Sequence, residues 1–179
     1  MAPREKVVVY HDEYSVCTGC RSCEMLCAIM HDGIYSPERS RIGFEVDNLK
    51  RMMHHLYTCE QCDDHPCYDA CPKQDDAMKI DEAGVVYIVQ DACIGCGKCV
   101  KACPYDPPRV HVVKRGKKRW AMKCDLCRGI EGGPVCIKNC PAMKLGTVAD
   151  SSEDLLTPKG WVITPEGAKR IEDAEGSVA

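Results

Sequence analysis

The sequence is poor in the large aromatic side chains that usually fill a protein core. It has one Phe, two Trp and seven Tyr among 179 residues. A chain of this length with so few aromatic residues would struggle to build a dense interior from side chains alone. We therefore expect another group to organise the interior.

The sequence also lacks long apolar runs and a strong charge of either sign. No apolar stretch approaches the roughly 20 residues that a bilayer-crossing helix needs. The first residues, MAPREKVVVYHDEY, contain no apolar segment of signal-peptide length. We therefore expect a cytoplasmic protein without direct membrane insertion. The formal net charge of −3 gives no support for a dedicated nucleic-acid binder.

Cysteine is the residue that the sequence has in excess, with 16 in all. They fall into four runs of four, and none is left over. Every run opens with a C-x2-C pair and closes with C-x3-C. The runs are I (Cys17, Cys20, Cys23, Cys27), II (Cys59, Cys62, Cys67, Cys71), III (Cys93, Cys96, Cys99, Cys103) and IV (Cys124, Cys127, Cys136, Cys140).

The spacing of runs I and III is that of bacterial ferredoxins. Three close thiolates wrap one [4Fe–4S] cubane, and the fourth, one helical turn further on, binds the neighbouring cluster. Proline follows the last cysteine of runs II, III and IV and stops the helical turn there. Ala28 follows Cys27 instead, so the turn in run I can continue through Ile29 and Met30. The sequence predicts four [4Fe–4S] clusters.

Other uses of the cysteines are less consistent with these spacings. The overlapping triplets of runs I and III hold three thiols too close together for a zinc ribbon. A disulfide framework would need an oxidising compartment, for which the sequence gives no sign. A self-sufficient enzyme would need an iron without a cysteine, and four thiolates for each cubane leave none. We expect electron transfer without catalysis by this chain; a zinc-bound structural module is the alternative from another class.

Four stretches carry a resemblance to a known family. They are CTGCRSCEMLC, CEQCDDHPCYDACP, DACIGCGKCVKACPYDPP and KCDLCRGIEGGPVCIKNCP, within residues 17–141. They resemble the four-cluster ferredoxin-like iron–sulfur subunits of molybdenum and tungsten oxidoreductases. The segment CEMLCAIMHDGIYSPERSRIGF resembles the versions that accompany tungsten enzymes of the aldehyde oxidoreductase family, which includes class II benzoyl-CoA reductase.

This resemblance implies the partners. One would be a catalytic subunit with tungsten or molybdenum bound by pterins. The other would be a flavoprotein, a ferredoxin or another iron–sulfur subunit. Complexes of the dimethyl sulfoxide reductase family, of hydrogenase or of CO dehydrogenase are the alternative settings.

The resemblance also implies how the runs share clusters, with I paired to IV and II to III. Spacing alone leaves open the other pairing, of I with II and III with IV. The implied ligand sets are Cys17, Cys20, Cys23 and Cys140 for cluster 1; Cys124, Cys127, Cys136 and Cys27 for cluster 2; Cys59, Cys62, Cys67 and Cys103 for cluster 3; and Cys93, Cys96, Cys99 and Cys71 for cluster 4.

The predicted fold class is α+β, with two ferredoxin-like modules of two clusters each, long loops and a C-terminal extension. Residues 1–58 and 104–149 would form the outer module, residues 59–103 the inserted module, and residues 150–179 a partner-docking tail. Strands are expected at residues 6–10, 42–46 and 85–89, because these stretches are β-branched or apolar. Residues 109–122 read as a hairpin with its turn at 114–117, and a short helix is expected after Thr164-Pro165.

Three features have more than one interpretation. The basic stretch KRGKKR, residues 114–119, favours a solvated hairpin tip over a nucleic-acid contact, with a docking patch for an acidic partner as a third possibility. The histidines near the cysteine runs are expected to form hydrogen bonds or lie at the surface and not to be ligands; they are His31, His54, His55 and His65. Trp161 could anchor a partner or pack on its own domain.

Overall fold

A computed structural model describes the backbone of residues 5–9, 17–47, 53–141, 145–149, 155–156, 161–164 and 167–170, and the side chains of 17–44 and 56–141. The described chain mixes short helices with short strands, as the sequence predicted. Among the described residues, no helix combines the length and apolar character needed to cross a membrane.

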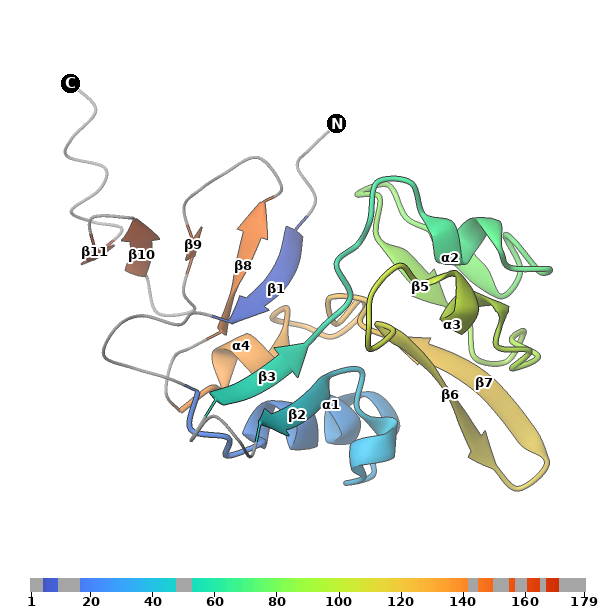
Figure 1. The fold of residues 1–179 in the computed structure, drawn as a ribbon, viewed down its shortest axis with the longest axis horizontal. Helices are drawn as coiled ribbons and strands as arrows, with labels where there is room; N and C mark the ends of the chain where they lie inside the picture. The colour runs from blue at the N-terminus through green and yellow to red at the C-terminus, as the bar shows by residue number, and fades with distance from the viewer. Residues whose placement is uncertain are drawn as a thin grey trace.

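The elements are short and follow one another closely along the chain (Figure 1). The helices are α1 (Ser22–Asp32), the 3-10 turn η1 (Pro37–Arg39), α2 (Pro66–Asp69), α3 (Lys98–Ala102) and α4 (Val135–Lys138). The strands are β1 (Glu5–Val9), β2 (Gly43–Asp47), β3 (Met53–Tyr57), β4 (Met78–Ile80), β5 (Val86–Ile88), β6 (Val110–Arg115), β7 (Lys118–Lys123), β8 (Leu145–Ala149), β9 (Leu155–Leu156), β10 (Trp161–Thr164) and β11 (Gly167–Arg170).

Strands from the two ends of the chain share one sheet. Its order is β1-β8-β9-β10-β11, and β1 pairs antiparallel with β8 from Glu5 opposite Ala149 to Val9 opposite Leu145. The other described sheets are the two-stranded pairs β2-β3, β4-β5 and β6-β7. The β1–β8 pairing therefore brings the segment before run I next to the segment after run IV.

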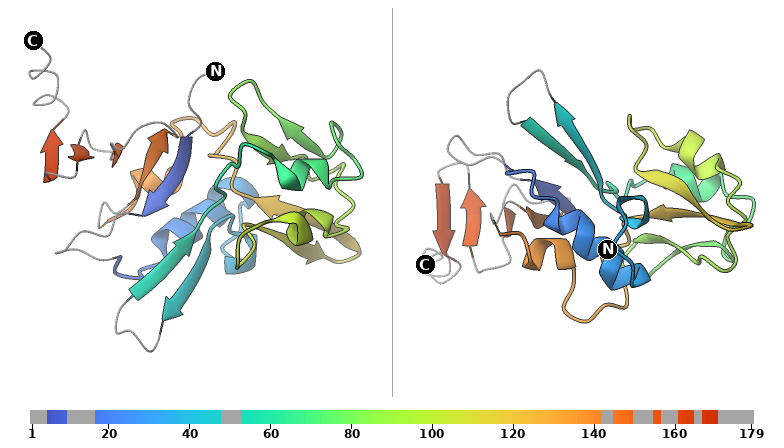
Figure 2. Two further views of the ribbon diagram at one scale, coloured as in Figure 1. Left: turned by 45° about the horizontal axis from the view of Figure 1, so that its top comes forward. Right: turned by 90° about the horizontal axis from the view of Figure 1, so that it is seen from below.

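Helices α1 and α4 pack against each other on the side of the molecule that holds this sheet (Figures 1 and 2). Their contact is a small core of Cys23, Cys27, Ile42, Cys136 and Ile137. Cysteines supply most of this core, which agrees with the shortage of large apolar side chains in the sequence.

Helices α2 and α3 pack together on the other side, beside the β6–β7 hairpin (Figures 1 and 2). The core there includes Met78, Val86 and Cys99, and the hairpin adds Val110 and Ala121 to it. The hairpin lies beyond residue 103, where the expected boundary put the outer module. It nevertheless packs on the 59–103 segment, because the apolar face of its two strands covers that core.

Several local predictions agree with the structure. Strands β1, β2 and β5 overlap the three expected strand segments, and the hairpin turns at Gly116 and Lys117. Helix α1 continues past Cys27 to Asp32, as expected from the absence of a proline there. The helix expected after Thr164-Pro165 is wrong: Gly167–Arg170 is strand β11, which pairs with β10.

Candidate cluster-binding sites

The four cysteine runs share one backbone plan. The third cysteine of every run is the second residue of a helix: Cys23 in α1, Cys67 in α2, Cys99 in α3 and Cys136 in α4. The fourth cysteine comes four residues later, about one helical turn. In runs II, III and IV the helix ends before this cysteine, whereas in run I it continues. The gap between the second and third cysteine, which differs in length among the runs, thus lies in the loop before each helix.

Those loops contain left-handed backbone. Gly95 and Gly97 precede α3 with φ of 62° and 77°, and in runs II and IV Gln61 and Cys127 adopt φ of 50° and 59°. Alternation between left-handed and right-handed residues turns successive N–H groups toward one concave side, which favours a negatively charged guest. The loops therefore offer backbone donors where an anionic cluster would bind.

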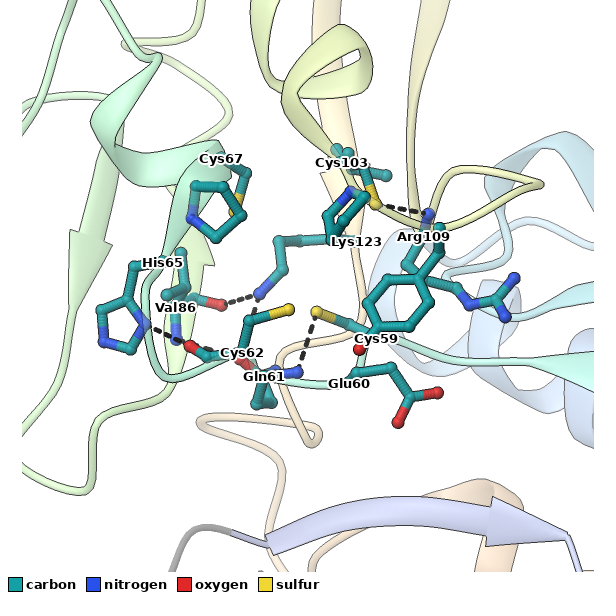
Figure 3. Close-up of a pocket in the computed structure, with 14 residues that line it drawn as sticks. Cys59, Glu60, Gln61, Cys62, His65, Cys67, Val86, Cys103, Arg109 and Lys123 are labelled. Carbon is teal, nitrogen blue, oxygen red and sulfur yellow. Dashed lines mark hydrogen bonds between the residues drawn. The ribbon is translucent and has the colours of Figure 1, made fainter.

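One cavity, which we call cavity A, is lined by Cys59, Cys62, Cys67 and Cys103. These are three cysteines of run II and the last cysteine of run III. The space between the surrounding atoms is about 370 Å³, including the part open to solvent. Figure 3 shows the sulfurs of Cys59 and Cys62 facing each other, with Lys123 close by.

A second cavity, cavity B, is lined by Cys71, Cys93, Cys96 and Cys99. These are three cysteines of run III and the last cysteine of run II. Its volume, about 360 Å³ counted in the same way, nearly equals that of cavity A. Runs II and III therefore exchange their last cysteines between two cavities of similar size.

Runs I and IV also bring their cysteines together. Burial raises the pKa of the Cys23 thiol to about 12, and the nearby Cys17, Cys140 and Cys20 add to the shift. Burial likewise raises the pKa of Cys136, where the next contributors are Cys124, Cys127 and Cys27. The closest electrostatic neighbours of each thiol thus include the other members of its expected ligand set.

Backbone N–H groups donate to several of these sulfurs. The donor-to-sulfur distance is 3.2 Å from Arg109 N to Cys103 Sγ, 3.3 Å from Ala121 N to Cys93 Sγ and 3.3 Å from Arg41 N to Cys27 Sγ. Such hydrogen bonds stabilise a thiolate more than a neutral thiol. The backbone is therefore arranged to favour charged sulfur ligands.

The cysteines suit a compact cluster better than one ion. Within the part of the chain that the structure describes, no three His, Cys, Asp or Glu side chains converge as ligands of a single metal ion. Burial raises the pKa of Cys99 to about 12 and that of Cys67 to about 11. These thiols must lose their protons to bind metal, and a positively charged iron centre offsets the cost of burying the thiolates. A cubane with one cysteine at each iron fits such a four-cysteine cavity.

Comparison with known families agrees with this chemistry. A family profile described as a 4Fe–4S dicluster domain matches residues 51–148, more than half of the chain. The chain belongs to the 4Fe–4S dicluster domain family. A second profile, a 4Fe–4S binding domain, matches residues 14–30, around run I. The predicted ferredoxin-like, iron–sulfur character is confirmed.

Individual relatives of this chain include proteins of Pyrococcus furiosus and Escherichia coli. It is 42% identical over 125 residues to the polyferredoxin-like subunit of aliphatic sulfonate oxidoreductase from Pyrococcus furiosus, an alignment that covers 69% of this chain and 66% of the relative. It is 36% identical over 148 residues to the electron transport protein HydN of Escherichia coli, covering 73% of this chain and 82% of HydN.

A solved structure also resembles this chain. It is the active-site complex BamBC of benzoyl coenzyme A reductase, matched at 25% identity and a TM-score of 0.43 over 80% of this chain and 76% of that one.

The structure locates two of the four candidate histidines among the described side chains. His65 lines cavity A, and its Nδ1 hydrogen-bonds the carbonyl of Cys62. His31 Nε2 lies 3.8 Å from Asp125 Oδ1. The side chains of His54 and His55 in β3, and that of Trp161, lie outside the described part, so their roles stay predictions.

Sequence reasoning missed two polar residues that are buried beside cavity A. Lys123 is 3% exposed and Gln61 2% exposed, and both line the cavity. Lys123 directly precedes run IV in the chain, so its sequence position suggested no contact with runs II and III. The β6–β7 hairpin brings it there, and no local signal in the sequence could have revealed this.

Proposed function

We propose that this chain relays single electrons through four [4Fe–4S] clusters, as a non-catalytic subunit between a tungsten or molybdenum pterin enzyme and a further redox partner. The observation that carries the proposal is the lining of cavities A and B. Each contains one complete set of four cysteines, and each set takes its last member from the other run. This exchange is the arrangement by which bacterial-type runs hold paired clusters.

The ligand sets follow from the same reasoning. Cavity A would hold cluster 3 and cavity B cluster 4. The neighbours of Cys23 and Cys136 support clusters 1 and 2 at runs I and IV. The β1–β8 pairing and the α1–α4 contact support an outer module that encloses the inserted one. The packing of the β6–β7 hairpin extends the inserted module beyond residue 103.

In this relay the protein itself holds the clusters in place and shields them from water. When bound, a [4Fe–4S] cluster supplies one-electron chemistry over a wide span of potentials. The cysteines fix its place, the N–H donors of Arg109, Ala121 and Arg41 stabilise negative charge on sulfur, and the surrounding side chains limit the access of water. No residue need act as an acid, a base or a nucleophile.

The identity of the catalytic partner rests on sequence similarity. The Pyrococcus furiosus relative is named as a subunit of an oxidoreductase, and the segment after run I resembles proteins that accompany tungsten enzymes. An enzyme of the aldehyde oxidoreductase or class II benzoyl-CoA reductase type is therefore the proposed partner. Dimethyl sulfoxide reductase-family, hydrogenase and CO dehydrogenase complexes are the alternatives, and a flavoprotein, a ferredoxin or another iron–sulfur subunit would meet the other end.

Metal analysis of the chain tests the central proposal. Protein prepared without oxygen should contain about sixteen iron atoms and about sixteen acid-labile sulfides per chain, four of each for every cubane. Its visible absorption should bleach on reduction. A colourless sample without labile sulfide would refute the proposal, and about four zinc ions per chain would favour the structural zinc module.

Purification from the native source tests the partner. The chain should be recovered, without oxygen, in a complex whose large subunit contains tungsten or molybdenum. Recovery with a nickel-containing subunit would favour the hydrogenase or CO dehydrogenase setting and contradict the tungsten assignment.

A further inference from the structure

A lysine ammonium is buried where the proposed clusters would add negative charge. The Nζ of Lys123 donates to Gln61 Oε1 at 3.2 Å and to the carbonyl oxygen of Val86. Both acceptors are neutral. Among the described residues no carboxylate forms an ion pair with Lys123; the one acidic residue that lines the same cavity is Glu60, and the two basic residues there, Lys123 and Arg109, outnumber it.

The four cysteines of cavity A lie around this ammonium. Lys123 lines the cavity with them, and Figure 3 shows its side chain extending across the space near Cys62 and Cys59. Burial raises the pKa of the Cys67 thiol, and the charge of Lys123 is the next contribution and opposes the rise. The ammonium is therefore close enough to act electrostatically on the sulfur ligands.

Arg109 adds a second positive group to the same cavity. It lines cavity A, its backbone N–H donates to Cys103 Sγ, and its guanidinium lies 4.4 Å from the ring centre of Tyr57. Cavity B differs in this respect. Apart from its cysteines it is lined mainly by apolar residues such as Met78 and Ile88, and its basic residue, Lys73, is exposed.

The difference in charge between the two cavities affects the free energy of adding an electron to each cluster. One-electron reduction adds a negative charge to a cluster that four thiolates already make negative. A nearby cation favours the reduced state, and the effect is larger in a buried site than at the surface. Two cavities of similar size and ligand set should therefore hold clusters of different potential.

We infer that Lys123 raises the reduction potential of the cluster in cavity A above that of the cluster in cavity B, so that an electron shared by the two rests mainly at cavity A. This inference rests on the proposed clusters. Burying the charged ammonium of Lys123 costs free energy, and an apolar residue at this position of β7 would avoid that cost. Stabilisation of a reduced cluster by the ammonium charge accounts for the lysine there. Lys123 would act through its charge and would not be a ligand.

The test compares variants of the whole chain, prepared without oxygen and titrated under EPR detection. In Lys123→Gln, an amide donor remains for the two acceptors while the charge is lost. We expect the equilibrium constant for reducing the cavity A cluster to fall at least about tenfold, which is about 59 mV for a one-electron couple. The cavity B couple should move much less. A Cys62→Ser variant, whose altered ligand changes only the cavity A signal, identifies which couple is which.

Two further variants separate charge from structure. Lys123→Arg keeps the charge and should keep the cavity A potential near that of the unmodified chain. Lys79→Gln removes the same charge from β4, where the side chain lines neither cavity, and should leave both couples in place.

The outcomes distinguish the inference from the function on which it rests. If Lys123→Gln has a full iron content and an unchanged cavity A potential, the inference is overturned and the relay is left intact. The same holds if the cavity A potential falls equally in Lys123→Arg and in Lys123→Gln. Absence of clusters from the unmodified chain overturns both. If Lys123→Gln loses iron, Lys123→Met at the same site, compared with Lys123→Arg, repeats the charge test; a cavity A cluster that is retained with Arg but lost from every neutral variant supports the electrostatic role.

Discussion

Gly95 shows how closely the cysteine loop of run III approaches the β6–β7 hairpin. A Cβ atom added there would lie 2.6 Å from the Cβ of Arg119 and 2.7 Å from its carbonyl carbon, and the residue has φ of 62°. Gly97, two residues on with φ of 77°, has nothing within 4 Å of an added Cβ. Gly95→Ala should therefore lower the free energy of unfolding by more than about 3 kcal/mol, and Gly97→Ala by about 1 kcal/mol from backbone strain alone.

Thermal and denaturant unfolding of the two glycine variants, with iron analysis of each, checks this prediction. Gly95→Ala should also lose iron from cavity B, since the loop cannot keep its place against β7. Equal stability of the two variants would contradict the close approach.

His111 gives the stability a dependence on pH. Burial lowers its pKa, its contact with the Glu38 carbonyl opposes this, and the nearby charge of Arg41 lowers the pKa further. In the unfolded chain this histidine takes up a proton below about pH 6.5, whereas the folded chain keeps it neutral to lower pH. Stability should therefore fall as the pH drops through about 6.5, and level off below the pKa of the folded state.

The contribution of His111 is measured as a difference between variants. The loss of stability between about pH 8 and about pH 6 should be smaller in His111→Gln than in the unmodified chain, by some tenths of a kcal/mol up to about 1 kcal/mol. The substitution changes no cysteine, so any acid sensitivity of the clusters should be equal in the two proteins and cancel in the comparison. A pH dependence that the substitution does not change would refute the assignment.

At the scale of the element, the β6–β7 hairpin is where charge concentrates. Residues 110–123 contain six Lys and Arg and no Asp or Glu, in a chain of net charge −3. The loop packed on the hairpin exposes Ile94 and Cys96 at the edge of cavity B. The loop at the edge of cavity B lies against this basic hairpin, because Gly95 approaches Arg119 closely. The solvated-tip and acidic-partner interpretations of the hairpin therefore compete directly.

Electron exchange with an acidic ferredoxin separates these interpretations. If the tip guides a partner, replacing Arg115 and Lys117 by Gln should slow the exchange several-fold at low salt and have little effect at high salt. We expect this result because both side chains are exposed at the tip of a hairpin rich in basic residues. Lys79→Gln, on β4, is the control. An exchange rate that neither substitution affects would identify the hairpin as a solvated tip.

The elements that could be predicted are those whose signal is local. The β-branched residues of β1 and β5 and the turn at Gly116 were readable, and so was the continuation of α1 where no proline follows Cys27. The strand Gly167–Arg170 was not, because its sequence favours a helix and only pairing with Trp161–Thr164 makes it extended. Lys123 could not be placed beside cavity A, since its contacts with Gln61 and Val86 join parts of the chain far apart in sequence.

For the whole molecule, cysteines are a large share of the residues that fill the described interior. Among the side chains that the structure describes, seven of the twenty buried apolar residues are cysteines, and the others are mostly small or medium in size. A chain with such a core gains little from burying side chains and would keep thiols packed against one another. Folding and cluster binding should therefore be coupled, so that the free energy of metal binding is a large part of the folding free energy.

Removal of iron under anaerobic conditions tests this coupling. After chelation with a mild oxidant, the stripped chain should lose its cooperative thermal transition and most of the circular dichroism of its strands and helices. Addition of iron, sulfide and a thiol reductant should restore both, because the same thiols then regain their metal. The Lys79→Gln variant should behave as the unmodified chain does. If the stripped protein melted cooperatively at the same temperature, the remaining apolar contacts, such as those of Met122, Val86 and Ile137, would be sufficient for folding. The clusters would then bind to an already folded chain, which would contradict the coupling.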